Sequence, residues 1–243
     1  MGVPTLGCEC AVCRSTDPRD RRSRPSVLVD FGGNSVLIDT TPDFREQALR
    51  EKVRKIDAVL YTHAHADHVL GLDDLRPLSF LGPNKIPLYA APEHSAIIRN
   101  MFRYAFDAVY PYGNLPQVEL KLLDGPLELL GARFEPISVL HGDAQVWGYR
   151  FGSAAYLTDF SEIPEGSMGK LKGLDVLFLD ALRHKPHPTH SNIANSLRIA
   201  ANLGARRTFF THICHDLGHE ETNRMLPPGV ELAYDGLKLE FEI

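Results

Sequence analysis

The sequence predicts an α/β fold in which two mixed β-sheets are flanked by helices. Short apolar runs rich in β-branched residues recur along the whole chain, and fewer stretches show the helical spacing of apolar residues. No repeat, linker or low-complexity tract divides the 243 residues. We therefore expect one domain, residues 1–243, in which two β-sheets lie between helical layers.

The expected strands are short apolar runs bounded by turn residues. Phe31–Asn34 and Asp235–Gly236 are glycine-containing turns of the kind that favours hairpins. We expect strands at Val27–Asp30, Ser35–Ile38, Ala58–Tyr61, Leu88–Ala90, Phe134–Leu140, Ala155–Leu157, Val176–Leu179, Thr208–Phe210 and Leu237–Phe241.

The helical stretches are fewer, and the third of them has clear end signals. Ser191 is a suitable N-cap, an apolar stripe of Ile193, Leu197 and Ala200 follows it, and Gly204 ends the helix. We expect helices at Asp43–Glu51, Glu93–Phe106, Ser191–Leu203 and Glu220–Met225.

Composition narrows the class of protein. Hydrophobic residues make up 44% and charged residues 23% of the chain, as in ordinary soluble globular proteins. No basic leader precedes an apolar segment, and no apolar run approaches the ~20 residues that cross a bilayer, so we expect a cytoplasmic protein without a membrane partner. The net charge of −5 argues against a stable nucleic-acid partner. The Arg-rich loop Arg14–Arg24 is the local exception; we favour a solvated face over a phosphate or partner contact.

The motif His63-x-His65-x-Asp67-His68 follows the apolar run Ile56–Tyr61. Side chains on an extended backbone repeat with a period of two, so His63 and His65 point the same way and can bind one metal. Asp67 and His68 come where the chain is expected to enter a helix, so they can face a second metal. Histidine and carboxylate ligands with room for water are typical of a catalytic metal site.

Three cysteines lie close together in Cys8-x-Cys10-x-x-Cys13. Thiols at this spacing seldom pair with each other, whereas they readily wrap a tetrahedral zinc ion. A disulfide or redox pair is less favoured in a cytosolic setting. The pattern therefore predicts a zinc site that takes a fourth ligand from elsewhere in the chain.

Other candidate ligands follow separate apolar runs. His141, Asp159 and His212 each come at or just past the end of an expected strand, as His63 does. Rigid strands that present ligands from one edge of a sheet build a preorganised site. Four such placements favour a common metal centre over four separate structural roles.

These residues give the chain a specific resemblance. Its H-x-H-x-D-H motif and the later His141, Asp159 and His212 resemble the metallo-β-lactamase superfamily in type and order. The resemblance implies a four-layered αβ/βα sandwich with two divalent metal ions, zinc or manganese. It also implies three groups of ligands: His63, His65 and His141 for the first metal, Asp67, His68 and His212 for the second, and Asp159 bridging both.

Within that superfamily, the cysteine cluster resembles the PhnP-type phosphoribosyl cyclic phosphodiesterases. In these enzymes a structural zinc is completed by a histidine three residues after the last catalytic histidine, which corresponds to His215; His219 is the alternative. The resemblance thus implies a structural zinc held by Cys8, Cys10, Cys13 and His215. These enzymes usually begin with a strand and a Leu-Gly-x-Gly-x-Ser turn ahead of the Gly2-Val3-Pro4 seen here. We therefore expect either that the start of this sequence was assigned late or that the first strand is missing.

The same resemblance implies a mechanism. A hydroxide bridging the two metals would attack phosphorus in line, and His190 would protonate the departing oxygen as general acid. His190 could instead only cap a helix. Asp67 is counted as catalytic as well as a ligand, and Asp39 and Asp180 are candidates to orient ligand imidazoles. Arg183 and Lys185 could contact a second phosphate or form a solvated basic loop.

The favoured function is hydrolysis of a small cyclic phosphodiester, a phosphoribosyl 1,2-cyclic phosphate. Three alternatives remain open. They are a tRNase Z-like RNA endonuclease, an ester or thioester hydrolase of the lactonase or glyoxalase kind, and a non-catalytic PqqB-like metal-binding protein. The chain lacks a long basic insertion for tRNA, and the cysteine cluster disfavours the second alternative. A homodimer is the commonest state among soluble oligomers.

Overall fold

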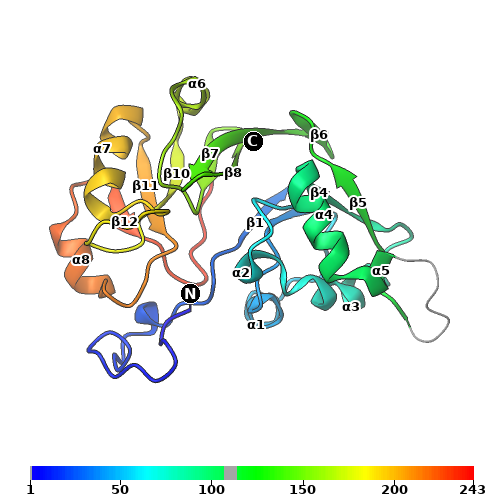
Figure 1. Cartoon of the computed structure of the whole chain (residues 1–243), viewed down its shortest axis with the longest axis horizontal. Helices are drawn as coiled ribbons and strands as arrows, with labels where there is room; N and C mark the ends of the chain where they lie inside the picture. The colour runs from blue at the N-terminus through cyan, green and yellow to red at the C-terminus, as the bar shows by residue number, and fades with distance from the viewer. Residues whose placement is uncertain (1, 107–113) are drawn as a thin grey trace. The chain divides into compact units, whose positions relative to one another are not determined.

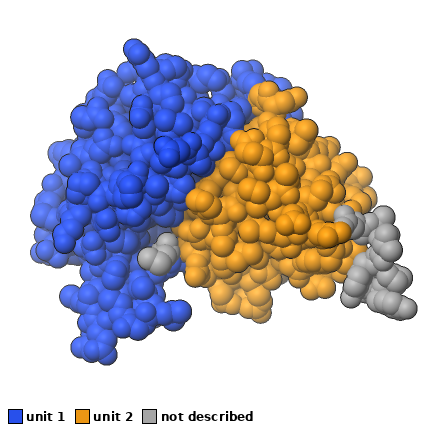
Figure 2. Space-filling view, in the orientation of Figure 1, with its two compact units in different colours: residues 1–23, 126–243 blue, residues 24–125 orange. Residues whose placement is uncertain are grey.

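The computed structural model describes residues 2–106 and 114–243. The chain divides into two compact units (Figure 2): unit 1 holds Met1–Ser23 and Pro126–Ile243, and unit 2 holds Arg24–Gly125. Each unit contains one β-sheet with its own helices (Figure 1). The predicted α/β class with two mixed sheets flanked by helices is confirmed. That residues 1–243 act as one domain stays a prediction.

Unit 2 is built on the sheet β1-β2-β3-β4-β5. β1 and β2 form the predicted antiparallel hairpin, with Gly32 and Gly33 at φ values of 54° and 79° in its turn, and the other neighbouring strands are parallel. The strands of the described residues are β1 (Val27–Phe31), β2 (Asn34–Ile38), β3 (Ala58–Leu60), β4 (Ile86–Ala90) and β5 (Val118–Leu122).

The helices of unit 2 pack around an apolar core formed by residues such as Val59, Val69, Leu72 and Leu88. The single helix expected at Glu93–Phe106 is instead two, because Phe102 leaves the helical conformation at φ −114°, ψ 38° with its ring buried in this core. The helices are α1 (Phe44–Arg50), α2 (Ala66–Val69), η2 (Leu72–Leu75), α3 (Arg76–Ser79), α4 (Pro92–Met101) and α5 (Arg103–Phe106).

Unit 1 is built on the sheet β12-β11-β10-β9-β8-β7-β6. In chain order, β6 to β9 form an antiparallel meander and β9 to β12 are parallel to each other. Because β7 runs in the same direction as β9, the strands β7, β9, β10 and β11 all end at the same edge of the sheet. The strands are β6 (Leu127–Leu129), β7 (Ala132–His141), β8 (Ala144–Phe151), β9 (Ala154–Leu157), β10 (Val176–Asp180), β11 (Arg207–Thr211) and β12 (Val230–Leu232).

The helices α7 and α8 lie beside the parallel strands in Figure 1. The N-cap of α7 is Asn192, whose side chain accepts from Asn195 N, so the predicted cap at Ser191 was one residue early. The predicted stop at Gly204 is confirmed by its φ of 67°. The helical elements are η1 (Pro18–Asp20), α6 (Glu165–Met168), η3 (Gly169–Leu171), α7 (Ile193–Leu203) and α8 (His219–Met225).

The strand expected at Leu237–Phe241 was wrong. The backbone around it is held by isolated bonds, such as Arg207 Nη2 to Glu240 O at 2.8 Å and Ser153 N to Glu242 O at 2.7 Å, rather than by a strand ladder. Among the described residues, no helix combines the length and apolar character needed to cross a membrane.

Candidate metal sites

In unit 2, parallel strands bring Asp39 and the histidine motif to one edge of the sheet. Asp39 directly follows β2, and Thr62 and His63 follow the neighbouring β3. Asp39, His63 and His68 are buried, whereas His65 is exposed at the start of α2. Nε2 of His63 lies 2.8 Å from Nδ1 of His65, so these two imidazoles converge as the period of two predicts.

Asp39 orients the imidazoles of His63 and His68. Its carboxylate accepts from Thr62 N and Thr62 Oγ1, both at 2.8 Å, and from Nδ1 of His68 at 2.7 Å. Because the Thr62 hydroxyl proton points to Asp39, its oxygen accepts from Nδ1 of His63 at 3.0 Å. Both histidines therefore carry the Nδ1 proton, and Nε2 is the nitrogen that can ligate a metal. Burial raises the pKa of Asp39, while His68 and Thr62 act against that rise.

In unit 1, the common carboxyl edge of β7, β9, β10 and β11 presents a second group of polar side chains. His141 ends β7, Asp180 ends β10, and Asp159 and His212 lie just past β9 and β11. His212 Nε2 lies 3.2 Å from Asp159 Oδ1. Ligand atoms of Asp159, Asp180, His190 and His212 all lie within 4.8 Å of one another. Nitrogen and carboxylate donors this close can share a divalent cation.

The contacts of His141 suit a neutral metal ligand. Its Nδ1 donates to the carbonyl oxygen of Thr189 at 2.7 Å, so Nε2 is the nitrogen available to a metal. Burial lowers the pKa of His141, which favours the uncharged imidazole that ligation requires. Gly142, at φ 63°, packs against Thr189; a Cβ there would lie 3.0 Å from Thr189 Cγ2 and press on this support.

His190 lies beside the ligands and is held by its own carboxylate. Its Nδ1 is 2.9 Å from Oδ2 of Asp180, a fully buried side chain that also accepts from Phe160 N. The His190 ring stacks on His212, with centroids 4.9 Å apart and planes at 10°, and meets the edge of His141 at 4.6 Å.

The backbone is strained at three of these positions. Among the described residues other than glycine, five have positive φ, and Asp39, Asp159 and His212 are three of them, at 64°, 52° and 54°. This left-handed conformation is uncommon for such residues and clusters at functional sites. The strain supports a functional role for the carboxyl edges of both sheets.

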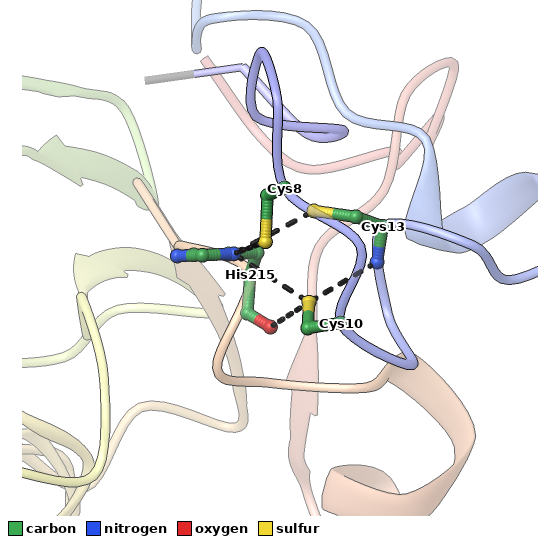
Figure 3. Close-up of side chains that lie close together, drawn as sticks. All are labelled: Cys8, Cys10, Cys13 and His215. Atoms are coloured by element: carbon green, nitrogen blue, oxygen red, sulfur yellow. Dashed lines mark hydrogen bonds between the residues drawn. The ribbon is translucent and has the colours of Figure 1, made fainter.

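The three cysteines of the N-terminal loop meet His215, as Figure 3 shows. The Sγ atoms of Cys8, Cys10 and Cys13 lie 3.2, 3.5 and 3.5 Å from His215 Nδ1. Zinc bonded tetrahedrally to a thiolate at about 2.3 Å and an imidazole at about 2.0 Å holds those atoms about 3.5 Å apart. The donor set and its spacing therefore fit a zinc ion. The N–H of Cys13 donates to Cys10 Sγ and is the main reason that the pKa of Cys10 falls to about 6.

In the loop before His190, Arg183 contacts the backbone of its own loop; a substrate contact by Arg183 or Lys185 stays a prediction. Arg183 donates from Nε to Lys185 O at 3.2 Å and from Nη2 to Pro186 O at 2.9 Å, so it braces its own loop. Lys185 is exposed. His187 lies nearer the site than either: its ring centroid is 5.0 Å from that of His190, and its Nδ1 accepts from Thr189 N.

Sequence reasoning missed several of these supports. It assigned no chemical role to Thr62, Thr189 or His187, nor to His94, whose buried ring lies 6.2 Å from that of His63. Threonine beside a ligand histidine carries no distinctive sequence signal. Asp39 and Asp180 were candidates to orient ligands; the structure places Asp39 on His68 and Asp180 on His190.

Comparisons with known proteins agree with this geometry. A family profile described as a beta-lactamase superfamily domain matches residues 34–213. A crystal structure described as a new diphosphatase from the PhnP family is 60% identical, with a TM-score of 0.94 over 100% of this chain and 94% of that one. An octanoyltransferase of Porphyromonas gingivalis is 37% identical over 98% of this chain, and a ribonuclease Z of Bradyrhizobium diazoefficiens is 31% identical over 57%. The chain spans only 49% and 47% of those two proteins.

Proposed function

This chain belongs to the metallo-β-lactamase superfamily, in its PhnP-like branch, and we propose that it hydrolyses small cyclic phosphodiesters with the help of divalent metal ions. The preferred substrate in this proposal is a phosphoribosyl 1,2-cyclic phosphate. One observation carries the choice of a phosphodiester: the pair formed by the buried Asp180 and the half-buried His190, beside the candidate ligands Asp159 and His212.

The ligand assignment follows the family's order. We propose His63, His65 and His141 for one metal, Asp67, His68 and His212 for the other, and Asp159 for both. When bound, two such cations would supply Lewis acidity, lower the pKa of a water molecule and neutralise charge on phosphoryl oxygens. Asp39 and Thr62 hold the Nδ1 protons of His63 and His68, and Thr189 holds that of His141. These contacts fix the ring orientations before a metal binds.

His190 supplies the proton that the leaving group needs. A sugar oxygen leaves poorly as an alkoxide, so a positioned acid contributes ~10²–10⁴-fold to its departure. The carboxylate of Asp180 accepts from Nδ1 and stabilises the imidazolium, which then donates from Nε2. Stacking on His212 keeps the ring beside the candidate ligands rather than in solvent.

A second candidate substrate class is a diphosphate. The crystal structure at 60% identity is described as a diphosphatase, and this favours cleavage of a phosphoanhydride. The same ligands suit both reactions, but phosphate is a far better leaving group than a sugar alkoxide. An acid held in place by a buried carboxylate is therefore needed less for the diphosphate than for the cyclic diester.

Other reaction classes have less support. The ribonuclease Z relative matches 57% of this chain, and the octanoyltransferase is about twice its length, so neither name transfers to the chain directly. The reacting group of an ester or thioester is uncharged, so its hydrolysis does not need metal ions to neutralise an anionic substrate. A non-catalytic metal-binding protein of the PqqB kind would not explain the hydrogen-bonded Asp180–His190 pair.

A substrate panel tests the proposal. Purified protein supplied with manganese or zinc is assayed on ribose 1,2-cyclic phosphate 5-phosphate, 2′,3′-cyclic nucleotides, bis(p-nitrophenyl) phosphate, ADP-ribose, and a thioester and a lactone. We expect the highest kcat/KM on the phosphoribosyl cycle. A clear preference for ADP-ribose would move the assignment to the diphosphate, and activity on the thioester or lactone alone would overturn both phosphate reactions.

A further inference from the structure

A buried arginine joins the N-terminal loop to the histidine loop, which we define as residues 212–219. Arg22 has 6% of its surface exposed. Its Nη1 donates to Cys214 O at 3.2 Å and its Nη2 to Leu217 O at 2.7 Å. Its Nε donates to Arg19 O at 3.1 Å, so all three guanidinium nitrogens are used. These bonds lie on both sides of His215 in the sequence.

Asp20 completes the contact. It accepts from Arg22 Nη2 at 2.9 Å and from His219 N at 2.8 Å, and it is itself 7% exposed. The backbone of Arg22 is fixed as well, because it exchanges two hydrogen bonds of 2.8 Å with Val3. A planar guanidinium can satisfy several carbonyls at once, which a lysine ammonium cannot do in the same geometry. The Arg22–Asp20 pair therefore ties both ends of the N-terminal loop, at Val3 and at Arg19–Arg22, to one short segment.

The histidine loop needs such support because it begins with strain. His212 sits at φ 54°, a conformation that persists only where surrounding contacts enforce it. The cysteine cluster holds the loop through the His215 side chain, and Arg22 holds it through the carbonyls of Cys214 and Leu217. The two sets of contacts share no side chain.

We propose that Arg22, paired with Asp20, is a positioning residue for His212 and acts independently of the cysteine cluster. In this arrangement Arg22 touches no substrate. It keeps the histidine loop in the conformation that presents the His212 imidazole beside Asp159 and His190. Loss of the guanidinium would let His212 relax, and a metal ion that uses this imidazole would bind more weakly.

The first test uses Arg22→Met and Arg22→Lys in the full chain, with Arg21→Met as the matched control. Arg21 is an exposed arginine next in the same loop. The readouts are manganese affinity by calorimetry after chelation, zinc content per chain, and kcat and KM on bis(p-nitrophenyl) phosphate. We expect both Arg22 variants to bind manganese about tenfold or more weakly, the range typical for loss of a residue that supports a ligand. We also expect kcat to fall at limiting metal, KM to change little, and excess manganese to restore activity.

A purely structural role would give a different result. Arg22→Met would then lower the melting temperature with manganese affinity unchanged, and this outcome overturns the proposal. If Arg22→Met does not fold, Asp20→Asn gives the same test, because it removes the charge while keeping the shape. Calorimetry needs no turnover, so it separates failure of this proposal from failure of the proposed function.

A double variant tests independence from the cysteine cluster. Cys10→Ser removes a candidate zinc ligand and Arg22→Lys weakens the second set of contacts. Because the two sets of contacts act independently, the combined loss of manganese affinity should be about the product of the two single losses. A combined loss no larger than that of either single variant would mean that both act through one contact and would overturn the claim of independence.

Discussion

Nδ1 of His190 lies 2.9 Å from Oδ2 of Asp180, and the Asp180 side chain is fully buried at the end of β10. A buried carboxylate fixes which nitrogen of the imidazole faces inward and stabilises the charged ring. The same carboxylate accepts from Phe160 N, so the acceptor does not move with the ring. This relationship supports the proposed role of His190 as a general acid, which its place in the sequence alone left open beside a helix cap.

The first prediction concerns that carboxylate. Asp180→Asn keeps an acceptor near Nδ1 but removes the charge that stabilises imidazolium. We expect kcat on a sugar cyclic phosphate to fall by ~10²-fold and to fall much less on bis(p-nitrophenyl) phosphate, whose leaving group needs no proton. Steady-state kinetics on both substrates checks this. Equal losses would show that Asp180 acts only through folding or metal binding.

Asp39 is predicted to act through metal affinity. Asp39→Asn disturbs the hydrogen bonds to Thr62 and His68. The imidazoles of His68 and, through Thr62, of His63 then lose their fixed tautomers. We expect metal affinity to weaken by about 10–100-fold, as is typical for a residue that orients metal ligands. Calorimetry with manganese measures it, with Asp30→Asn in β1 as control. Unchanged affinity in the Asp39 variant would contradict the role.

The proposed structural zinc site makes a prediction about metal content. Cys10→Ser removes one of three thiolates around His215, and a site with three remaining ligands holds zinc poorly. We expect zinc per chain to fall by about one and the melting temperature to drop, because metal-binding energy contributes to folding. Elemental analysis and a thermal melt test this, with Cys214→Ser as the matched control. Zinc content and melting temperature equal to wild type would refute the site.

The pKa of Cys10 gives a prediction in the metal-free chain. Because this pKa is lowered to about 6, the thiolate predominates above that pH and disappears as the pH falls through it. Burial raises the pKa of Cys214, which therefore stays a thiol at neutral pH. Iodoacetamide should alkylate Cys10 faster than Cys214 at pH 7, with a midpoint near pH 6. Peptide mass spectrometry across pH would contradict this if both cysteines reacted with the same profile.

The sequence predicted the fold through its apolar runs and the ligand candidates through their place after those runs. His141, Asp159 and His212 could be found because a histidine or aspartate after a buried strand stands out. β5, β6, β8 and β12 were missed, since their runs mix polar residues or glycine with apolar ones and carry a weak periodic signal.

The supporting residues were harder to predict for a different reason. Thr62 contacts His63 through its hydroxyl, and Thr189 contacts His141 through its backbone carbonyl. Neither kind of contact has a recognisable sequence motif. Arg22 lies in an arginine-rich loop for which the sequence favoured exposure to solvent. Its guanidinium is instead buried against Cys214 and Leu217. Its partners lie nearly 200 residues away in the chain, at separations of 192 and 195, so only the fold brings them together.

The measurement that tests the account most directly compares wild type with His190→Ala on two substrates. One is ribose 1,2-cyclic phosphate 5-phosphate, and the other is bis(p-nitrophenyl) phosphate. The account predicts a loss of ~10²–10⁴-fold in kcat on the sugar cyclic phosphate and near-normal turnover of the nitrophenyl ester, with metal content unchanged. Near-normal turnover of the sugar cyclic phosphate by His190→Ala would contradict the assignment of His190 as the general acid.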